Sequence, residues 1–292
     1  MSTPEGSRRQ GSFQHVTYAS HSGVARIVLA RPETRNALGI GPQSSRAEIE
    51  HCLDLAKADE SVRCVLISAE GPSFCAGGDL SGLPQQPTPM DEKWFTDELD
   101  RFHHHVRTFP KPLIAAVQGH CVGAGLSFAL QCDVVLAGED ARFGLPEGRF
   151  GHPGAVEVAM AAGPAVAKFL IFSGELLDAE AAVRFGMALT VIRNGRLEQR
   201  SEELAMRIAR MPADALQLNK AAINAAAEVG GREAGRRAGR ALDLITKVMS
   251  HQALAPDGRT FDHILQTEGV RGMRAAQRQQ FTHSWWEPTD DC

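Results

Sequence analysis

Two glycine-rich segments each follow an apolar run, and their backbones are the first candidates for chemistry. They are FCAGGDL at 74–80 and GHCVGAGL at 119–126. A glycine loop that opens a helix directs unpaired N–H groups outward, at the positive end of the helix dipole. Such a site suits an anion or an oxyanion that develops during a reaction. Tight turns with close packing have the same composition, so each loop taken singly leaves both interpretations open.

Nicotinamide and metal sites are not expected. The loop at 119–126 lacks the G-x-G-x-x-G spacing of a dinucleotide-binding turn, and no acidic residue follows where a ribose contact would be. The run His103–His105 lies on a predicted helix, where consecutive side chains point in different directions. Three adjacent histidines therefore do not suit one metal ion.

Composition limits the class of protein. The 292 residues are 43% hydrophobic, enough for a sizeable core, and the formal charge of −4 gives no basic field for nucleic acid. The six cysteines form no C-x-x-C pair, which favours buried free thiols over disulfides or zinc and a reducing compartment. The polar N-terminus lacks the apolar region of a signal peptide, and no apolar run approaches the ~18 residues of a membrane span. We expect a cytoplasmic protein that does not enter a membrane.

The segments before the second loop alternate between strand and helix patterns. The sequence predicts strands at 15–19, 24–30 and 62–69, and helices at 41–57 and 91–108. Residues 1–12 are polar and predict a flexible tail. Three prolines at 81–91 indicate a mobile loop.

The second loop lies inside a compact α/β unit. LIAAV at 113–117 predicts a strand, 119–125 a glycine turn, 126 onward a helix, and DVVLA at 133–137 another strand. This order is typical of parallel sheets. Both strands are apolar throughout, as expected when helices cover both faces of the sheet.

The rest of the chain is mostly helical. Asp178 is a good N-cap and Gly186 a good C-cap for one helix, and 188–192 predicts a last strand. Two or three helices are expected in 201–249, and one or two in 259–281. We place a boundary near residue 200, which divides a core at 13–200 from a helical region at 201–292.

Five motifs occur in the order and spacing of one known family. They are RPETRNAL (31–38), SFCAGGDL (73–80), KPLIAAVQGHCVGAG (111–125), ALQCDVVLA (129–137) and ARFGLPEGRFGHPG (141–154). From about residue 13 the chain resembles the crotonase (enoyl-CoA hydratase/isomerase) superfamily. The resemblance implies an α/β fold, a crotonase-like spiral of ββα turns with a C-terminal helical region. It also implies a homotrimer or homohexamer, in which the C-terminal region supports trimerisation and covers coenzyme A.

The resemblance implies an acyl-CoA substrate and no cofactor other than its coenzyme A. The family's oxyanion hole maps to the N–H groups of Gly78 and Ala124. Ala124 stands where glycine is usual; its N–H remains, but the added methyl narrows the approach. Coenzyme A contacts map to four residues near these loops: Arg35, Ala37, Ala76 and Asp79.

The acid/base positions depart from the family's hydratases, which carry two glutamates that hold one water between them. Here the first position is Ser127 and the second is Glu147, the main candidate for proton transfer. Ser127 either fills the place of a lost carboxylate or holds a substrate hydroxyl or water, as hydroxycinnamoyl-CoA hydratase-lyases similarly pair a serine with a glutamate. A nucleophilic role would need an adjacent histidine base.

Several charged residues have two interpretations. Glu157 follows a loop that is one residue shorter than usual, and is either a second acid in the pocket or a charge on a helix face. His120 and His152 are either structural or part of the site. Arg274 and Arg278 are placed to reach phosphates from the last helix, or lie on the surface.

The resemblance predicts a lyase or isomerase of the enoyl-CoA hydratase/isomerase type, of the kind used in fatty acid metabolism. One alternative is hydrolysis of a carbon–carbon or thioester bond, which would require a histidine near Glu147. The other is a non-catalytic CoA-binding protein, in which Glu147 would form a salt bridge away from the glycine loops.

Overall fold

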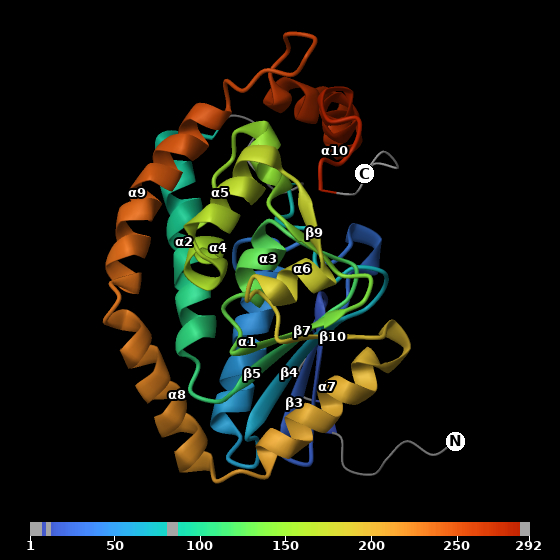
Figure 1. Cartoon of the computed structure of the whole chain (residues 1–292). Helices are drawn as coiled ribbons and strands as arrows, with labels where there is room; N and C mark the ends of the chain where they lie inside the picture. Colours follow the sequence, from blue (N-terminus) through green and yellow to red (C-terminus); the bar gives the residue numbers. More distant parts are fainter. Residues whose placement is uncertain (1–7, 10–12, 81–86, 287–292) are drawn as a thin grey trace.

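The computed structural model is an α/β core followed by a helical arm (Figure 1), and it describes residues 8–9, 13–80 and 87–286. The main sheet has seven strands in the order β1–β2–β3–β4–β5–β7–β10. They are β1 (Arg8–Arg9), β2 (Val16–His21), β3 (Val24–Leu29), β4 (Cys64–Ala69), β5 (Leu113–Val117), β7 (Val134–Gly138) and β10 (Thr190–Ile192). The expected strands are therefore present, and part of the predicted N-terminal tail pairs with β2.

The centre of this sheet is parallel. β3, β4, β5, β7 and β10 pair in parallel, whereas β1, β2 and β3 form an antiparallel edge. All five residues of β5 are buried, and so are the first four of β4. This burial on both faces explains why these segments are continuous apolar runs.

A second sheet corrects the expectation of a plain glycine turn at 119–125. It contains β6 (His120–Val122), β8 (Arg142–Gly144) and β9 (Leu176–Asp178). The N–H of Cys75 donates to the carbonyl of His120 (2.9 Å), and the N–H of Val122 donates to the carbonyl of Cys75 (3.1 Å). Long-range pairing creates these three-residue strands, which are too short for a periodic pattern to reveal.

The helices cover the sheets and continue into the arm. The α-helices are α1 (Ser45–Ala58), α2 (Pro89–Thr108), α3 (Ala124–Ala129), α4 (Val156–Ala162), α5 (Pro164–Ser173), α6 (Ala179–Arg184), α7 (Asn194–Ala209), α8 (Ala213–Glu228), α9 (Arg232–Ser250) and α10 (Phe261–Gln280). Two 3₁₀ helices are η1 (Pro32–Thr34) and η2 (Pro146–Phe150). Asp178 caps α6 as predicted, accepting from the N–H of Ala181 at 2.7 Å.

Two expected boundaries shift in the structure. Pro89–Asp91, assigned to a mobile loop, begin α2, because Thr88 and Asp91 form a reciprocal capping box. Residues 81–86 of that loop lie outside the described residues. The boundary expected near residue 200 falls within α7, which packs on the sheet beside Leu66 and Leu136.

The larger core lies between the main sheet and the helices on the face opposite α7. At its centre the Phe128 ring stacks on Phe74 and is tilted against Phe102, with ring centroids 6.2 and 5.3 Å apart. Four described cysteines are buried and a fifth is half-buried; all five are free, as predicted. No described helix is long and apolar enough to cross a membrane.

The C-terminal helices form an arm around the core. Figure 1 shows α8 and α9 along one side, with α9 beside α2 and α10 turning back over the end of the molecule. α10 is bent at Gly269, whose φ of 67° is non-helical, so one continuous stretch holds two helical pieces. The arm thus brings residues 232–281 next to the segment that contains the glycine loops.

Candidate active site

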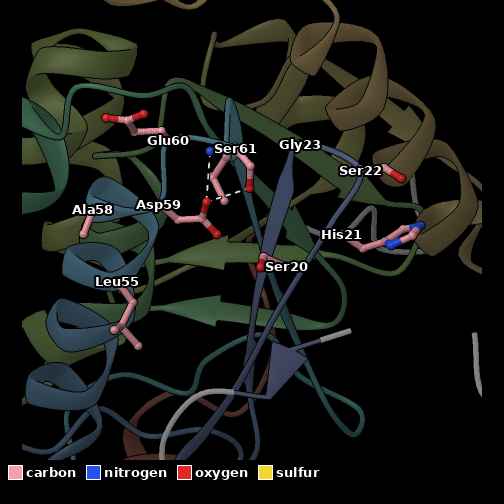
Figure 2. A pocket seen from close by; sticks show the side chains of 10 residues that line it. Ser20, His21, Ser22, Gly23, Leu55, Ala58, Asp59, Glu60 and Ser61 are labelled. Atoms are coloured by element: carbon pink, nitrogen blue, oxygen red, sulfur yellow. Dashed lines mark hydrogen bonds between the residues drawn. The ribbon is translucent and has the colours of Figure 1, made fainter. Parts of the chain in front are cut away.

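Two cavities stand out, and only the larger contains the predicted site. A cavity of about 650 Å³ lies between the β2–β3 turn and the end of α1 (Figure 2). There, Ser61 donates both its N–H and its hydroxyl to Asp59. The other cavity, of about 1360 Å³, is lined by both glycine loops, Ser127 and Glu147.

The two glycine loops are joined by backbone hydrogen bonds. The first loop follows β4, and its Cys75 pairs with Cys121 of β6 in a parallel bridge. The N–H of Leu38 donates to the carbonyl of Gly77 at 2.8 Å, which holds the other side of this loop. A β-carbon on Gly77 would lie 3.9 Å from the nitrogen of Ala124. The loops that the sequence separates by about 45 residues are thus in contact.

The N–H groups of Gly78 and Ala124 are unpaired within the described residues. Ala124 is the first residue of α3, so its N–H has no partner inside the helix. The neighbouring N–H groups of Leu38 and Asp79 hydrogen-bond within the loop bridge, whereas that of Gly78 does not. Both residues line the large cavity, and a β-carbon on Gly78 would meet no atom within 4 Å.

Glu147 projects from η2 against the second glycine loop. A β-carbon on Gly123 would lie 3.1 Å from its Oε2, and one on Gly154 would lie 2.8 Å from its Oε1. Gly123 and Gly154 also have positive φ values, 55° and 151°. Space and backbone conformation therefore both favour glycine at the two positions that enclose the carboxyl. The Glu147 carboxyl therefore packs against Gly123, the residue that directly precedes Ala124.

Within the described residues the Glu147 carboxyl forms no ion pair, and only a hydrogen bond with its own backbone favours the charged form. Its Oε2 is buried and makes no hydrogen bond. Burial disfavours the charged form and raises the pKa of Glu147 to about 8. This is not the salt bridge away from the glycine loops that a non-catalytic protein would show. A buried carboxyl of raised pKa in a cavity is typical of a group that exchanges protons.

Comparison with known proteins decides the family. The family model described as "Enoyl-CoA hydratase/isomerase" matches residues 19–257. The chain belongs to the enoyl-CoA hydratase/isomerase family. The resemblance seen in the five motifs is thereby confirmed, and the chain is an enzyme of lyase or isomerase type that acts on CoA thioesters.

Individual relatives and solved structures agree with this family. A 2,3-dehydroadipyl-CoA hydratase of Escherichia coli is 34% identical over 70% of this chain and 80% of its own. A 1,2-epoxyphenylacetyl-CoA isomerase of E. coli is 32% identical over 89% of this chain and 95% of its own. An enoyl-CoA hydratase/isomerase structure from Xanthobacter autotrophicus Py2 superposes with a TM-score of 0.85 at 30% identity, covering 92% of this chain and 99% of that one. The crotonase fold predicted from the sequence is therefore confirmed.

Ser127 and two histidines complete the surroundings of Glu147 in this enoyl-CoA hydratase/isomerase family member. Ser127 is buried on α3, one turn after Ala124, and lines the cavity. His152 also lines the cavity, and its backbone N–H donates to the backbone carbonyl of Glu147 at 3.0 Å. Burial lowers the pKa of His152 to about 3, so its ring is neutral. His120 lies at the exposed mouth, where desolvation and then Arg35 lower its pKa.

The four residues assigned to coenzyme A all line the same cavity: Arg35, Ala37, Ala76 and Asp79. The N–H of Ala76 donates to the carbonyl of Arg35 at 2.9 Å, so the two segments are in contact. Asp79 forms a 2.9 Å ion pair with Arg31. Arg274 and Arg278 of α10 reach the cavity too, and desolvation followed by the charge of Arg35 lowers the pKa of Arg274.

Glu157 corresponds to neither expectation alone. It is buried on α4 and lines the cavity, and neighbouring side chains compensate its negative charge. Its carboxylate accepts from Gln131 at 2.8 Å and from Arg236 at 3.1 Å. His103 lies 3.9 Å away and has a buried Nε2 without a partner. Because these contacts favour the anion, the pKa of Glu157 is lowered despite burial.

Sequence reasoning missed a polar stripe on α9. Arg236, Arg240, Asp243 and Lys247 all line the cavity. Their spacing of three or four residues places them on one face of the helix. This spacing was the available signal, but a stripe of charges on a surface helix normally faces water.

The histidine run 103–105 diverges as expected. His103 points into the buried cluster around Glu157, His104 is exposed, and His105 lies 3.4 Å from Glu50. Within residues 8–9, 13–80 and 87–286, no group of three or more histidine, cysteine or acidic side chains is arranged to hold a metal ion.

Proposed function

We propose that this enzyme moves a proton on an enoyl-CoA thioester, with Glu147 as the acid/base and the N–H groups of Gly78 and Ala124 holding the thioester oxygen. The position of Glu147, enclosed and unpaired beside Gly123, supports this most. Removing a proton next to the thioester places negative charge on one oxygen, which two fixed donors stabilise. A carboxyl whose pKa lies near neutrality can both accept and return that proton.

Double-bond isomerisation is the reaction for which one carboxyl suffices. Glu147 removes a proton from one carbon, the electron pair shifts into an enolate, and Glu147 returns the proton to another carbon. Another acid that lines the cavity, Glu157, is held by Arg236 and Gln131. Its charge is therefore not available for proton transfer in the way that the unpaired Glu147 is.

Heavy water distinguishes the reactions. The purified enzyme would be incubated with 2-enoyl- and 3-enoyl-CoA esters in deuterium oxide and the products read by mass spectrometry. We expect deuterium incorporation and a shifted double bond without the mass of added water. Binding of these esters without deuterium incorporation or any other change would contradict the proposal.

Hydration is the second candidate, supported by the position of Ser127. Its side chain lines the cavity one helical turn after Ala124, where it can hold a water or a hydroxyl. Glu147 would then deprotonate the water that Ser127 positions. A gain in mass of one water in the same assay, lost in Ser127→Ala, would favour this reaction.

Hydrolysis of a carbon–carbon or thioester bond stays a third candidate because His152 lines the same cavity. The His152 ring is neutral, because burial lowers its pKa to about 3, and it can position a water by a hydrogen bond. Free thiol released from an acyl-CoA would reveal thioester cleavage, and a shortened acyl chain would reveal carbon–carbon cleavage.

The cavity mouth suits the phosphates of coenzyme A. Arg35, Arg274 and Arg278 gather there, and no ion pair within 4 Å links any of them to a described carboxylate. Like charges that repel one another without compensation form a ready site for phosphate groups. We assign the adenine nucleotide end of the substrate to this side, with Ala37, Ala76 and Asp79 along the path to the glycine loops. Proton transfer of this kind requires no cofactor beyond the substrate's own coenzyme A.

We propose a homotrimer or a pair of trimers. α9 exposes large apolar side chains outward: Leu242 (65% exposed), Ile245 (56%) and Met249 (64%). α8 likewise exposes Leu218 and Ile223. Contiguous apolar side chains on neighbouring helices favour contact with another subunit.

A further inference from the structure

The wall of the cavity between α2 and α9 is polar, where a simple acyl chain would need apolar contacts. Figure 1 shows α9 running beside α2. Arg236, buried on α9, pairs with Asp100 of α2 and with Glu157. Arg240 donates to Asp100 at 2.7 Å and to Asp97 at 2.5 Å. These two arginines are therefore matched by carboxylates.

Lys247 is not matched in this way. It is only 8% exposed, lines the cavity, and its Nζ lies 5.9 Å from the ring centre of Phe95. The carboxylates whose charges act on it are Glu92 and Asp262. His251 contacts Glu92 at 2.9 Å and Asp262 at 2.5 Å. Within the described residues, no carboxylate lies within 4 Å of the Lys247 Nζ.

Burial without a partner is costly for a lysine. It lowers the pKa of Lys247, in spite of the raising effect of Glu92. A nearly enclosed ammonium group that faces a cavity is stabilised when a ligand supplies the missing negative charge.

Two further charged residues that line the cavity are Arg46 of α1 and Asp243 of α9. Arg46 is buried and lines the cavity; its Nη1 donates to the carbonyls of Leu38 and Gly39, while its Nε and Nη2 have no partner. Asp243 has no ion pair with any other described residue, and burial followed by the charge of Glu157 raises its pKa to about 6. Lys247 and Arg46, which form no ion pair within the described residues, thus line the same cavity as Asp243, an acid that keeps its proton to a higher pH than usual.

We infer that this enzyme takes acyl-CoA thioesters whose acyl group bears a second carboxylate, and that Lys247 binds this carboxylate. The inference rests on the proposed function, since it places the thioester at Gly78 and Ala124 and the acyl group along the α2–α9 wall. An acyl group ending in a methyl would leave the lysine buried and unpaired. A carboxylate would form a charge-assisted hydrogen bond with it.

The test compares the binding of saturated esters of matched chain length. These esters have no double bond, so the measured affinity does not depend on turnover. Succinyl-, glutaryl- and adipyl-CoA would be titrated calorimetrically against butyryl-, valeryl- and hexanoyl-CoA. We expect at least one carboxylated ester to bind about tenfold more tightly than its methyl-ended counterpart. Lys247→Met should bring this ratio near one, and Lys247→Arg should keep most of it.

Arg237→Met is the matched control, because Arg237 is an exposed cation on the same helix outside the cavity. It should retain the preference. Equal or tighter binding of the methyl-ended ester at every length would overturn the inference, as would a preference that survives in Lys247→Met. If Lys247→Met does not fold, the wild-type ratio alone decides. If the esters take up no deuterium in the heavy-water assay but the carboxylated esters still bind more tightly, the proposed reaction is contradicted and the inference is not.

Discussion

The residues packed around the Glu147 carboxyl determine its burial and its pKa. Its carboxyl is enclosed by Gly123 and Gly154, and no cation of the described residues acts on its pKa. The burial that raises its pKa to about 8 accompanies its packing against Gly123, the residue before Ala124. At the scale of single residues, the proposed proton transfer therefore rests on a carboxyl that burial keeps protonated up to a pKa of about 8.

Replacing Glu147 with glutamine should remove proton transfer but preserve shape. We expect Glu147→Gln to reduce kcat by about 10²–10⁴-fold, the usual contribution of a positioned acid/base. Affinity for an acyl-CoA, measured by calorimetry, should change little. Weakened binding together with unchanged turnover of the bound ester would contradict the role assigned to Glu147.

The same substitution should change stability in a pH-dependent way. In the folded state Glu147 keeps its proton up to a pKa of about 8, whereas the unfolded chain releases it near 4.5. The wild type therefore loses stability as the pH rises between these values, because the unfolded state binds fewer protons. Glu147→Gln should melt at a higher temperature than wild type above pH 8, and the difference should vanish below about pH 4.5. Calorimetric melting across this range would show it; a difference independent of pH would contradict it.

At the scale of elements, the site is a contact between two loops. β4 delivers the first glycine loop and β6 the second, and Gly125 of α3 packs directly on Cys75. A β-carbon on Gly125 would lie 2.6 Å from that of Cys75 and 2.8 Å from the Cys75 carbonyl oxygen. The distance between the proposed donors thus depends on a position where only glycine fits.

Gly125→Ala should separate the loops. We expect a stability loss of about 1–3 kcal/mol, as for other overpacked positions, and a larger relative fall in kcat/KM than in acyl-CoA affinity. Denaturant unfolding and steady-state kinetics would measure the two effects. Gly195→Ala on α7 is the control, since a β-carbon there meets no atom within 4 Å and activity should be unaffected. Full activity in Gly125→Ala would argue against a fixed pair of donors.

At the scale of the whole molecule, α9 has two distinct faces. Arg236 and Lys247 face the cavity and are buried, whereas Leu242 and Ile245 are exposed. This arrangement is the reverse of a normal surface helix. It is consistent with an outer face covered by another subunit and an inner face that lines a polar acyl pocket.

The assembly can be tested through this outer face. Wild type should have a mass of three or six times 31.5 kDa by sedimentation velocity. Leu242→Glu combined with Ile245→Glu should shift the protein toward monomer, because buried carboxylates would replace side chains that contribute about 1.5–3 kcal/mol each. Leu189→Glu, at an exposed leucine before β10, is the comparison. A monomeric wild type would remove the proposal.

The sequence by itself determined the family, the main parallel strands, the cap at Asp178 and the loops that form the cavity. These features depend on local patterns: apolar runs, capping residues and glycine spacing repeat along the chain itself. The family resemblance also singled out Glu147, Gly78 and Ala124, all of which line one cavity.

Only the tertiary structure decided what lies opposite them. β6, β8 and β9 exist because distant backbones pair, and no three-residue pattern predicts that pairing. Arg46, His103 and Lys247 looked like ordinary polar positions on helices. The burial of His103 and Lys247 follows from α9 folding back beside α2 across about 140 residues of chain, and whether a charge is paired depends on its neighbours in space.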